Sequence, residues 1–260
     1  MLLQGKVAIV SGAGRGFGRA CAILFAREGA DLVIVSRTAK ELEETSALIM
    51  AEGGTVTALA GDVARGEDVA RVVASAVETF GSVDILLNNA AVIGPTKPLT
   101  DVGEAEWDHA MGIDLKGAFL LSRGVAPHMI RQKRGKIINV TSGLGEMVLS
   151  PFGVYSVAKA ALNHMTRIMA EELKVHNIQV NGLDPAVMDT RMQEEIRGFG
   201  PAVLGIEVFE SFASLKEHGR LLPPERVASL AVFLASAKAD HITGENGTTS
   251  HYRKFGFKSE

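Results

Sequence analysis

Tyr155 and Lys159 are the two residues of this chain whose types and spacing most directly suggest chemistry. They lie four positions apart at the start of a segment with helical periodicity, so both side chains point to one face of a helix. A phenol can donate a proton to the alkoxide that develops when a hydride reduces a carbonyl, and a neighbouring ammonium lowers its pKa from the usual value of about 10. The pair predicts a tyrosine acid and base, with a purely structural pair as the alternative.

Two further polar segments follow predicted strands. Ser142 lies thirteen residues before Tyr155, just after the strand expected at 137–140. The segment 88–91, Asn-Asn-Ala-Ala, closes the strand expected at 85–87. A hydroxyl at Ser142 would hold a substrate oxygen beside the phenol, so we interpret Ser142, Tyr155 and Lys159 as one catalytic group.

A glycine-rich turn follows the first predicted strand. Residues 11–18 read Ser-Gly-Ala-Gly-Arg-Gly-Phe-Gly, and a helical pattern follows them. Glycine is needed where a chain turns sharply and where its backbone approaches a pyrophosphate, and the free N–H groups of a helix N-terminus bind that anion. At the first strand–helix junction this run predicts a dinucleotide site made by Gly12, Arg15, Gly16, Phe17 and Gly18.

The end of the second predicted strand bears on which nicotinamide cofactor binds. A carboxylate there would accept hydrogen bonds from the adenosine 2′-hydroxyl and repel a 2′-phosphate, but about 20 residues after the glycines the chain has Ser36 and Arg37 instead. The Arg37 guanidinium suits a phosphate, and Arg15 can approach the same group. We expect NADP(H), with NAD(H) as the less favoured cofactor; the structural alternative is that Arg37 only caps a surface turn.

Short apolar runs alternate with helical segments along the chain. Several of the runs are apolar on consecutive residues, as in strands covered on both faces. The β–α–β–α order predicts a doubly wound parallel sheet with helices on both sides. Strands are expected at 7–10, 32–35, 56–60, 85–87, 137–140 and 178–180, and helices at 15–29, 39–52, 67–80, 104–131 and 155–176.

These motifs together resemble the short-chain dehydrogenase/reductase family. The glycine-rich turn, the Asn-Asn-Ala segment, Ser142 and the Tyr155–Lys159 pair occur in the family's order, and the resemblance runs from about Gly5 to Gly244. It implies a single-domain α/β Rossmann fold over residues 1–260 with about seven parallel strands. The chain is similar to NADP-preferring members of the 3-oxoacyl-carrier-protein reductase type.

The resemblance also implies roles for individual residues. Tyr155 would be the proton donor and acceptor, Ser142 would position the substrate, and Lys159 would bind the nicotinamide ribose and lower the tyrosine pKa. Helices 104–131 and 155–176 would form the interface of a homotetramer, or of a dimer. Further cofactor contacts are implied for residues that match the family's adenine-binding and carboxamide-binding segments: Asp62, Val63, Asn89, Ala90, Pro185, Val187 and Thr190.

Three departures from the family's pattern affect these expectations. Asp114 stands where asparagine commonly supports a water chain to the active-site lysine, and an ionised aspartate only accepts hydrogen bonds. The relay is then altered, or the carboxyl is held protonated, or the main-chain carbonyl does the work alone. Pro185-Ala186 replaces the usual Pro-Gly, which we expect to be harmless. After Gly244 the tail lacks the usual Asp-Gly-Gly segment, and would reshape a neighbouring subunit's pocket or a subunit contact.

The segment 188–222 breaks the strand–helix rhythm with glycine, proline and phenylalanine. It follows the sixth strand, on the side where open α/β sheets bind ligands. We interpret it as a mobile, partly helical lid over the substrate; a surface helical hairpin is the alternative. Glu146 and Arg191 leave room for polar groups, whereas the apolar pocket candidates suggest a moderately hydrophobic ketone: Ile93, Leu144, Val148, Met188, Phe199, Phe209 and Phe212.

The function predicted is hydride transfer between NADP(H) and a carbonyl or secondary alcohol, with Tyr155 as proton donor and acceptor. The sequence identifies neither the substrate nor the physiological direction. Two rivals stay open: an NAD-specific dehydrogenase with the same chemistry, and a dinucleotide-binding sensor or structural subunit without turnover.

Composition argues against several other classes. The chain of 260 residues is 47% hydrophobic with a net charge of −3, so it has no general field for nucleic acid. We interpret the basic cluster at 131–136 as the solvated end of a helix. Cys21 is the single cysteine, and no apolar run approaches the roughly 18 residues of a membrane span. The segment before the first strand lacks the pattern of a signal peptide, so we expect none. The histidines show no metal-site spacing, so we expect a cytoplasmic protein with a small-molecule substrate and no metal, membrane or nucleic-acid partner.

Overall fold

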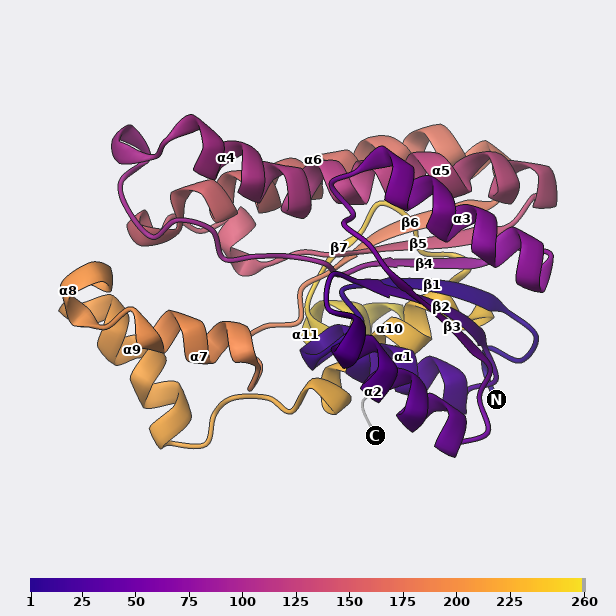
Figure 1. The fold of residues 1–260 in the computed structure, drawn as a ribbon, viewed down its shortest axis with the longest axis horizontal. Coiled ribbons are helices and arrows are strands. Elements are labelled where there is room, and N and C mark those ends of the chain that lie inside the picture. Colours follow the sequence, from indigo (N-terminus) through magenta and orange to yellow (C-terminus); the bar gives the residue numbers. More distant parts are fainter. Residues whose placement is uncertain (259–260) are drawn as a thin grey trace.

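Seven parallel strands form the central sheet of the computed structural model, which describes residues 1–258 (Figure 1). Their order in the sheet is β3-β2-β1-β4-β5-β6-β7, so the direction of winding reverses between β1 and β4. Ligands bind at such a reversal, beyond the carboxyl ends of the strands. The strands are β1 (Val7–Ser11), β2 (Asp31–Ser36), β3 (Val56–Ala60), β4 (Ile85–Asn88), β5 (Gly135–Val140), β6 (Ile178–Leu183) and β7 (Asn246–Gly247).

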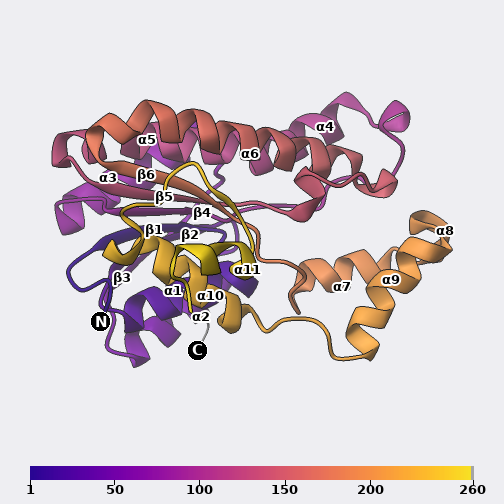
Figure 2. The same ribbon diagram turned by 180° about the vertical axis from the view of Figure 1, so that it is seen from behind.

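Helices cover both faces of this sheet, which confirms the predicted single-domain Rossmann fold (Figures 1 and 2). Alternate residues of β1 belong to two separate apolar cores: Val10 packs on one face and Ile9 on the other. This two-sided burial explains why the strands are apolar on consecutive residues. One face carries α1 (Gly16–Arg27), α2 (Ala39–Ala51) and α10 (Pro224–Ala235); the other carries α3 (Gly66–Phe80), α5 (Gly117–Gln132) and α6 (Gly153–Leu173).

The single helix expected at 104–131 is interrupted. Helix α4 (Glu104–Met111) is followed by a π-helical turn, Gly112–Lys116, and only then by α5. Such turns insert one residue into the helical hydrogen-bond ladder and are frequent at functional sites. Here the turn contains the buried Asp114.

The interpretation of the basic cluster as a solvated helix end is wrong for its last member. Lys133 ends α5 in the left-handed region, at φ 53°. Lys136, however, is buried in β5, and its Nζ lies 2.6 Å from the Asp240 carboxylate. Burial lowers the pKa of Lys136, and the hydrogen bond to Asp240 opposes that shift.

Segment 188–222 extends from one end of the sheet as three helices (Figure 1, orange). They are α7 (Arg191–Gly198), α8 (Pro201–Leu204) and α9 (Ile206–Glu217), so its helical character is as predicted, while its mobility and its function as a lid stay predictions. The tail after β7 forms α11 (Thr249–Tyr252), whose Tyr252 hydroxyl donates to the Gly182 carbonyl at 2.6 Å. Within residues 1–258 no helix is both long and apolar enough to span a membrane.

Candidate active site

A cleft of about 700 Å³ runs along the carboxyl ends of the strands. Gly18 and Val187 lie just outside its lining: a Cβ at Gly18 would collide with the Gly12 carbonyl, and the Val187 carbonyl accepts from Leu222 N at 3.0 Å. The structure thus gathers the predicted cofactor residues at one site, and their roles stay predictions. The lining includes Gly12, Arg15, Gly16, Phe17, Ser36, Arg37, Asp62, Val63, Asn89, Ala90, Tyr155, Lys159, Pro185 and Thr190.

The glycine-rich turn is fixed at the end of β1 by the side chain of Asn89, which follows β4. Gly12 and Gly16 have φ of 65° and 56°, values that favour glycine. Asn89 donates its side-chain amide to the Ser11 carbonyl at 2.9 Å and to the Gly12 carbonyl at 3.1 Å. Arg15, the N-cap residue of α1, makes no side-chain hydrogen bond to the helix. The first N–H groups of α1 are therefore available to an anion.

The far end of the cleft combines cations with one acid that the sequence analysis missed. Ser36 Oγ is buried without a hydrogen-bond partner among the described residues, and Arg37 is exposed at the rim. Arg15 lies 2.8 Å from Glu41 in the first turn of α2. Glu41 enters the site from the helix that follows β2 and not from the end of the strand itself.

The predicted catalytic residues converge at the opposite end of the cleft. Lys159 Nζ lies 5.4 Å from the centroid of the Tyr155 ring and donates to the Val140 carbonyl at 2.8 Å. Ser142 begins a 3₁₀ turn, Gly143–Gly145, and its Oγ accepts from Leu144 N at 3.2 Å. Tyr155 and Lys159 are both buried in the first turns of α6.

Burial dominates the electrostatics of this group. It raises the pKa of Tyr155, the Asp114 charge raises it further, and the Ser142 hydroxyl acts in the opposite direction. Burial lowers the pKa of Lys159, whereas the charges of Asp114 and Asp184 raise it. Burial is the largest of these effects, and the lowering of the tyrosine pKa by Lys159, predicted from the Tyr-x-x-x-Lys spacing, stays a prediction. Tyr155 is a protonated phenol at neutral pH, which is the form of a proton donor.

Asp114 lies beneath these residues with one carboxylate oxygen unused. Its Oδ1 accepts from Val92 N at 2.8 Å, while Oδ2 is buried without a hydrogen-bond partner among the described residues. Burial raises the pKa of Asp114 to about 6, and the Lys159 charge and the Val92 hydrogen bond oppose that rise. A carboxyl with this pKa titrates near neutrality, and its part in a proton relay stays a prediction.

The raised pKa of Asp114 predicts a pH-dependent stability. Because the folded chain holds this proton up to about pH 6 and the unfolded chain only to about 3.8, the carboxyl stabilises the fold at low pH, and that stabilisation is lost as the pH rises through about 6. Asp114→Asn removes this dependence. We expect the difference in unfolding free energy between Asp114→Asn and wild type, measured by denaturant titration, to shift by about 1–2 kcal/mol in favour of the variant from pH 5 to pH 8. Glu43→Gln, on the exposed face of α2, should track wild type; a pH-independent Asp114→Asn difference would contradict the shift.

Asp184 is a second acid that the sequence analysis missed. It follows β6, its N–H donates to the Gly247 carbonyl at 2.9 Å, and its Oδ1 accepts from Ala186 N at 2.9 Å. Burial raises the pKa of Asp184. The side chain thus closes a tight turn around Pro185, beside the lysine of the catalytic group. An acid directly before proline, at the end of a strand, was the signal available in the sequence.

That turn places Ala186 in the left-handed region, at φ 55°, which contradicts the expectation that alanine in place of the usual glycine is harmless. A non-glycine residue there costs about 1–2 kcal/mol. Ala186→Gly relieves the strain but adds flexibility to the unfolded chain, so we expect a net gain of about 0.5–1 kcal/mol in unfolding free energy. Ala74→Gly, at an exposed position inside α3, should lose a similar amount. An Ala186→Gly variant that is destabilised like Ala74→Gly would show that the alanine is not strained.

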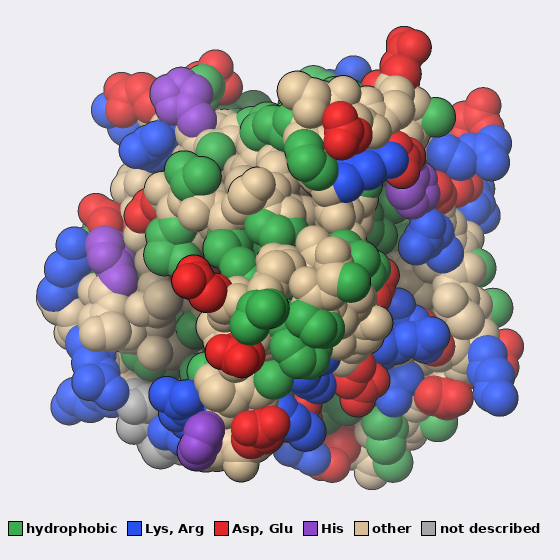
Figure 3. Space-filling model, turned by 90° about the vertical axis from the view of Figure 1, so that its left-hand side faces the viewer, with side chains coloured by type: hydrophobic (Ala, Val, Ile, Leu, Met, Phe, Trp, Pro, Cys, Tyr) green, Lys and Arg blue, Asp and Glu red, His purple; other side chains and the backbone are tan. Residues whose placement is uncertain are grey.

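An apolar cluster packs segment 188–222 against Tyr155. Tyr155 belongs to the same cluster as Ile93 and Phe152, with Ile196 and Leu204 from the segment. Partly buried neighbours include Leu144, Met192, Phe199, Phe209 and Phe212. Figure 3 shows this side of the molecule, with hydrophobic side chains gathered in the middle of the face and most charged ones towards its rim.

One of the expected pocket residues lies elsewhere, and a second is shared between the cleft and the core. Val148 is 97% exposed and so does not line an apolar pocket in this structure. Met188 is buried, but in the core beneath the sheet, although it also reaches the lining of the cleft. Within residues 1–258 no group of three or more His, Cys, Asp or Glu side chains is placed to hold a metal ion.

The chain is similar in sequence and in fold to known dehydrogenases and reductases. A family model described as short chain dehydrogenase matches residues 6–199. The 3-oxoacyl-[acyl-carrier-protein] reductase FabG of Thermotoga maritima is 34% identical, over 94% of this chain and 96% of that protein. An NAD-dependent glycerol dehydrogenase of Listeria innocua is 35% identical, over 93% of this chain and 91% of that protein. The crystal structure of levodione reductase superposes with a TM-score of 0.88 at 26% identity, over 98% of this chain and all of the other.

Proposed function

The chain belongs to the short-chain dehydrogenase family of oxidoreductases, and on that premise we propose that it transfers a hydride between NADP(H) and a carbonyl or secondary alcohol. The observation that carries this proposal is that Tyr155 and Lys159 line the same cleft as the glycine-rich turn. When bound there, the nicotinamide supplies or accepts the hydride. The proton donor Tyr155 and a cofactor bound in this cleft would therefore act on the same carbonyl group.

The residues of the cleft fit a phosphorylated dinucleotide. The uncapped N-terminus of α1 and the positive φ of Gly12 and Gly16 suit a pyrophosphate. At the adenosine end, Ser36 offers an unpartnered hydroxyl, and within residues 1–258 Arg37 makes no ion pair. These two residues, with Arg15, would hold a 2′-phosphate; Asp62 and Val63 would hold the adenine, and Asn89, Ala90, Pro185, Val187 and Thr190 the nicotinamide half.

The proton chemistry follows from the burial of the catalytic group. Tyr155 donates its phenolic proton to the substrate oxygen, and the Ser142 hydroxyl holds the same oxygen in place. Lys159, fixed on the Val140 carbonyl, stabilises the phenolate that results. Lys159 would then return a proton to the Tyr155 phenolate, and the Asp114 carboxyl, which takes its proton from solvent, would reprotonate Lys159. We propose ketone reduction as the reaction of this site, with the protonated phenol of Tyr155 as the donor.

Two other readings have support. The glycerol dehydrogenase relative is NAD-dependent, which favours the same chemistry with NAD(H). A sensor or structural subunit without turnover is favoured only by Asp114 in place of the usual asparagine. The complete Ser142, Tyr155 and Lys159 set argues against it.

The surroundings of the site extend the proposal. We propose that 188–222 is a mobile lid, since it packs on Tyr155 through apolar side chains. A homotetramer, or a dimer, through α4–α5 and α6 is supported by the exposed Phe119, Val157 and Ile168 and by an apolar groove beside Met111 and Met165. A cytoplasmic location is supported by the single, buried Cys21.

Turnover tests the proposal directly. Purified protein with NADPH and a panel of moderately hydrophobic ketones should consume NADPH, with one alcohol formed for each NADPH oxidised. A ketone of the panel that is reduced faster with NADH would favour the NAD(H) alternative. Binding of NADPH with no turnover on any ketone or alcohol would favour the sensor.

A further inference from the structure

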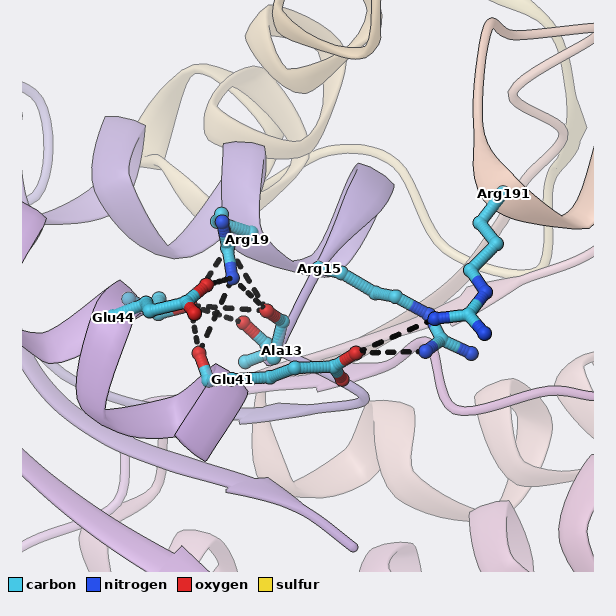
Figure 4. A network of polar contacts seen from close by, with 8 residues as sticks. Ala13, Arg15, Arg19, Glu41, Glu44 and Arg191 are labelled. Carbon is cyan, nitrogen blue, oxygen red and sulfur yellow. Dashed lines mark hydrogen bonds and ion pairs between the residues drawn. The ribbon is translucent and has the colours of Figure 1, made fainter. Parts of the chain in front are cut away.

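One carboxylate joins three segments that are far apart in the sequence (Figure 4). Glu41 Oε1, in the first turn of α2, lies 2.8 Å from Arg15 Nη1 of the glycine-rich turn. The same oxygen lies 4.0 Å from Nη1 of Arg191, the first residue of α7. Figure 4 shows the guanidinium groups of Arg15 and Arg191, which come from different segments, both directed at this carboxylate. Arg191 belongs to the proposed lid, so Glu41 links the lid to the cofactor turn.

This carboxylate lies at the adenosine end of the cleft. Glu41, Ser36, Arg37 and Arg191 all line it. A Cβ built on Gly14 would be 2.8 Å from Ser36 Oγ and 3.1 Å from Glu41 Oε2, so the hydroxyl and the carboxylate approach the same point. A group bound at Ser36 therefore meets the charge of Glu41.

Of the three side chains, that of Glu41 is held in place, whereas those of Arg15 and Arg191 can move. The Thr45 hydroxyl donates to the Glu41 carbonyl at 2.9 Å, and Arg19 donates to the same carbonyl at 3.3 Å, which anchors the start of α2. The Glu41 side chain is 22% exposed, against 51% for Arg15 and 67% for Arg191. Exposed ion pairs are weak, so either arginine can exchange partners at little cost.

We propose, resting on the cofactor assignment above, that Glu41 and Arg191 set the choice between NADP(H) and NAD(H). A 2′-phosphate carries about −1.5 to −2 charges and takes guanidinium groups in bidentate pairs. It competes with Glu41 for Arg15 and draws in Arg191 from the lid. A 2′-hydroxyl leaves both arginines on Glu41 and donates to that carboxylate. Glu41 thus weakens the binding of NADP(H) and strengthens that of NAD(H). Arg191 strengthens the binding of NADP(H) alone.

Adenosine 2′,5′-bisphosphate and AMP test this without any hydride chemistry. The ratio of their Kd values, measured by calorimetry at low salt, reports how much the 2′-phosphate contributes to affinity. In Glu41→Gln the preference for the bisphosphate should rise about 10-fold, because a repelling charge is removed, and in Arg191→Met it should fall about 10-fold. Glu44→Gln is the matched control: it lies one helical turn on and pairs with Arg19 at 3.0 Å, outside the cleft.

The outcomes separate this inference from the cofactor assignment. A preference within about twofold of wild type in either Glu41→Gln or Arg191→Met contradicts the inference, as does an equal change for both nucleotides. Wild-type protein that binds neither NADPH nor NADH contradicts the cofactor assignment itself. Limited proteolysis of residues 191–217 adds a second readout, since NADPH should protect this segment more than NADH does, and Arg191→Met should abolish the difference.

Discussion

Replacing Tyr155 by phenylalanine should lower kcat/KM for ketone reduction about 10²–10⁴-fold, the usual contribution of a positioned general acid. The ring stays in its apolar cluster with Ile93 and Phe152, so the fold and the contacts with segment 188–222 should be retained. Only the proton donor is lost. Steady-state rates give the activity, and the Kd for NADPH, measured by fluorescence quenching, should stay within about twofold of wild type.

The chain offers a matched control, because Tyr252 is its only other tyrosine. Tyr252 is also buried, and its hydroxyl donates to the Gly182 and Glu245 carbonyls at 2.6 and 3.1 Å. Tyr252→Phe should lose about 1 kcal/mol of stability while keeping its activity. If Tyr155→Phe keeps most of its turnover, or if both variants lose activity equally, Tyr155 is not the proton donor.

Arg37→Asp should reverse the cofactor preference. Wild type should bind NADPH more tightly than NADH, because the Arg37 guanidinium pairs with the 2′-phosphate. An aspartate removes that pair, adds repulsion and offers an acceptor to the 2′-hydroxyl of NADH. We expect the ratio of the two Kd values to change about 10²–10³-fold in favour of NADH.

Lys40→Asp makes the same change of charge nearby. Lys40 is exposed in the first turn of α2 and does not line the cleft. It should change the ratio by less than about threefold at physiological salt, since screening weakens interactions between separated surface charges. An unchanged NADPH affinity in Arg37→Asp would assign Arg37 to a surface turn and reopen the NAD(H) alternative.

The strands and the order of the motifs were predictable because each depends on a local property of the chain. Strands buried on both faces need consecutive apolar residues, and β2 (Asp31–Ser36) lies within two residues of its expected range. The candidate site residues converge because parallel strands bring their carboxyl ends to one edge. Gly12, Ser36, Asn89 and Tyr155, which are distant in the sequence, line one cleft for this reason.

What could not be predicted depends on geometry between elements. The π-helical turn at Gly112–Lys116 changes the hydrogen-bond ladder without changing which residues are apolar. Glu41 enters the cleft from a helix, and the ends of the strands in the sequence do not indicate it. The left-handed Ala186 is stabilised by the Asp184 side chain, a contact that composition does not reveal. The pKa of Tyr155 depends on how deeply α6 is buried, which spacing alone does not give.

The measurement that tests the central claim most directly is the thermal unfolding midpoint of the wild-type protein with NADPH and, in parallel, with NADH. A ligand that binds only the folded state stabilises it by RT ln(1 + [L]/Kd), so equal concentrations of the two cofactors compare their affinities without a known substrate. Both should raise the midpoint, and NADPH should raise it more. A larger rise with NADH would contradict the Arg37 assignment, and no rise with either cofactor would contradict the assignment of this cleft to a nicotinamide dinucleotide.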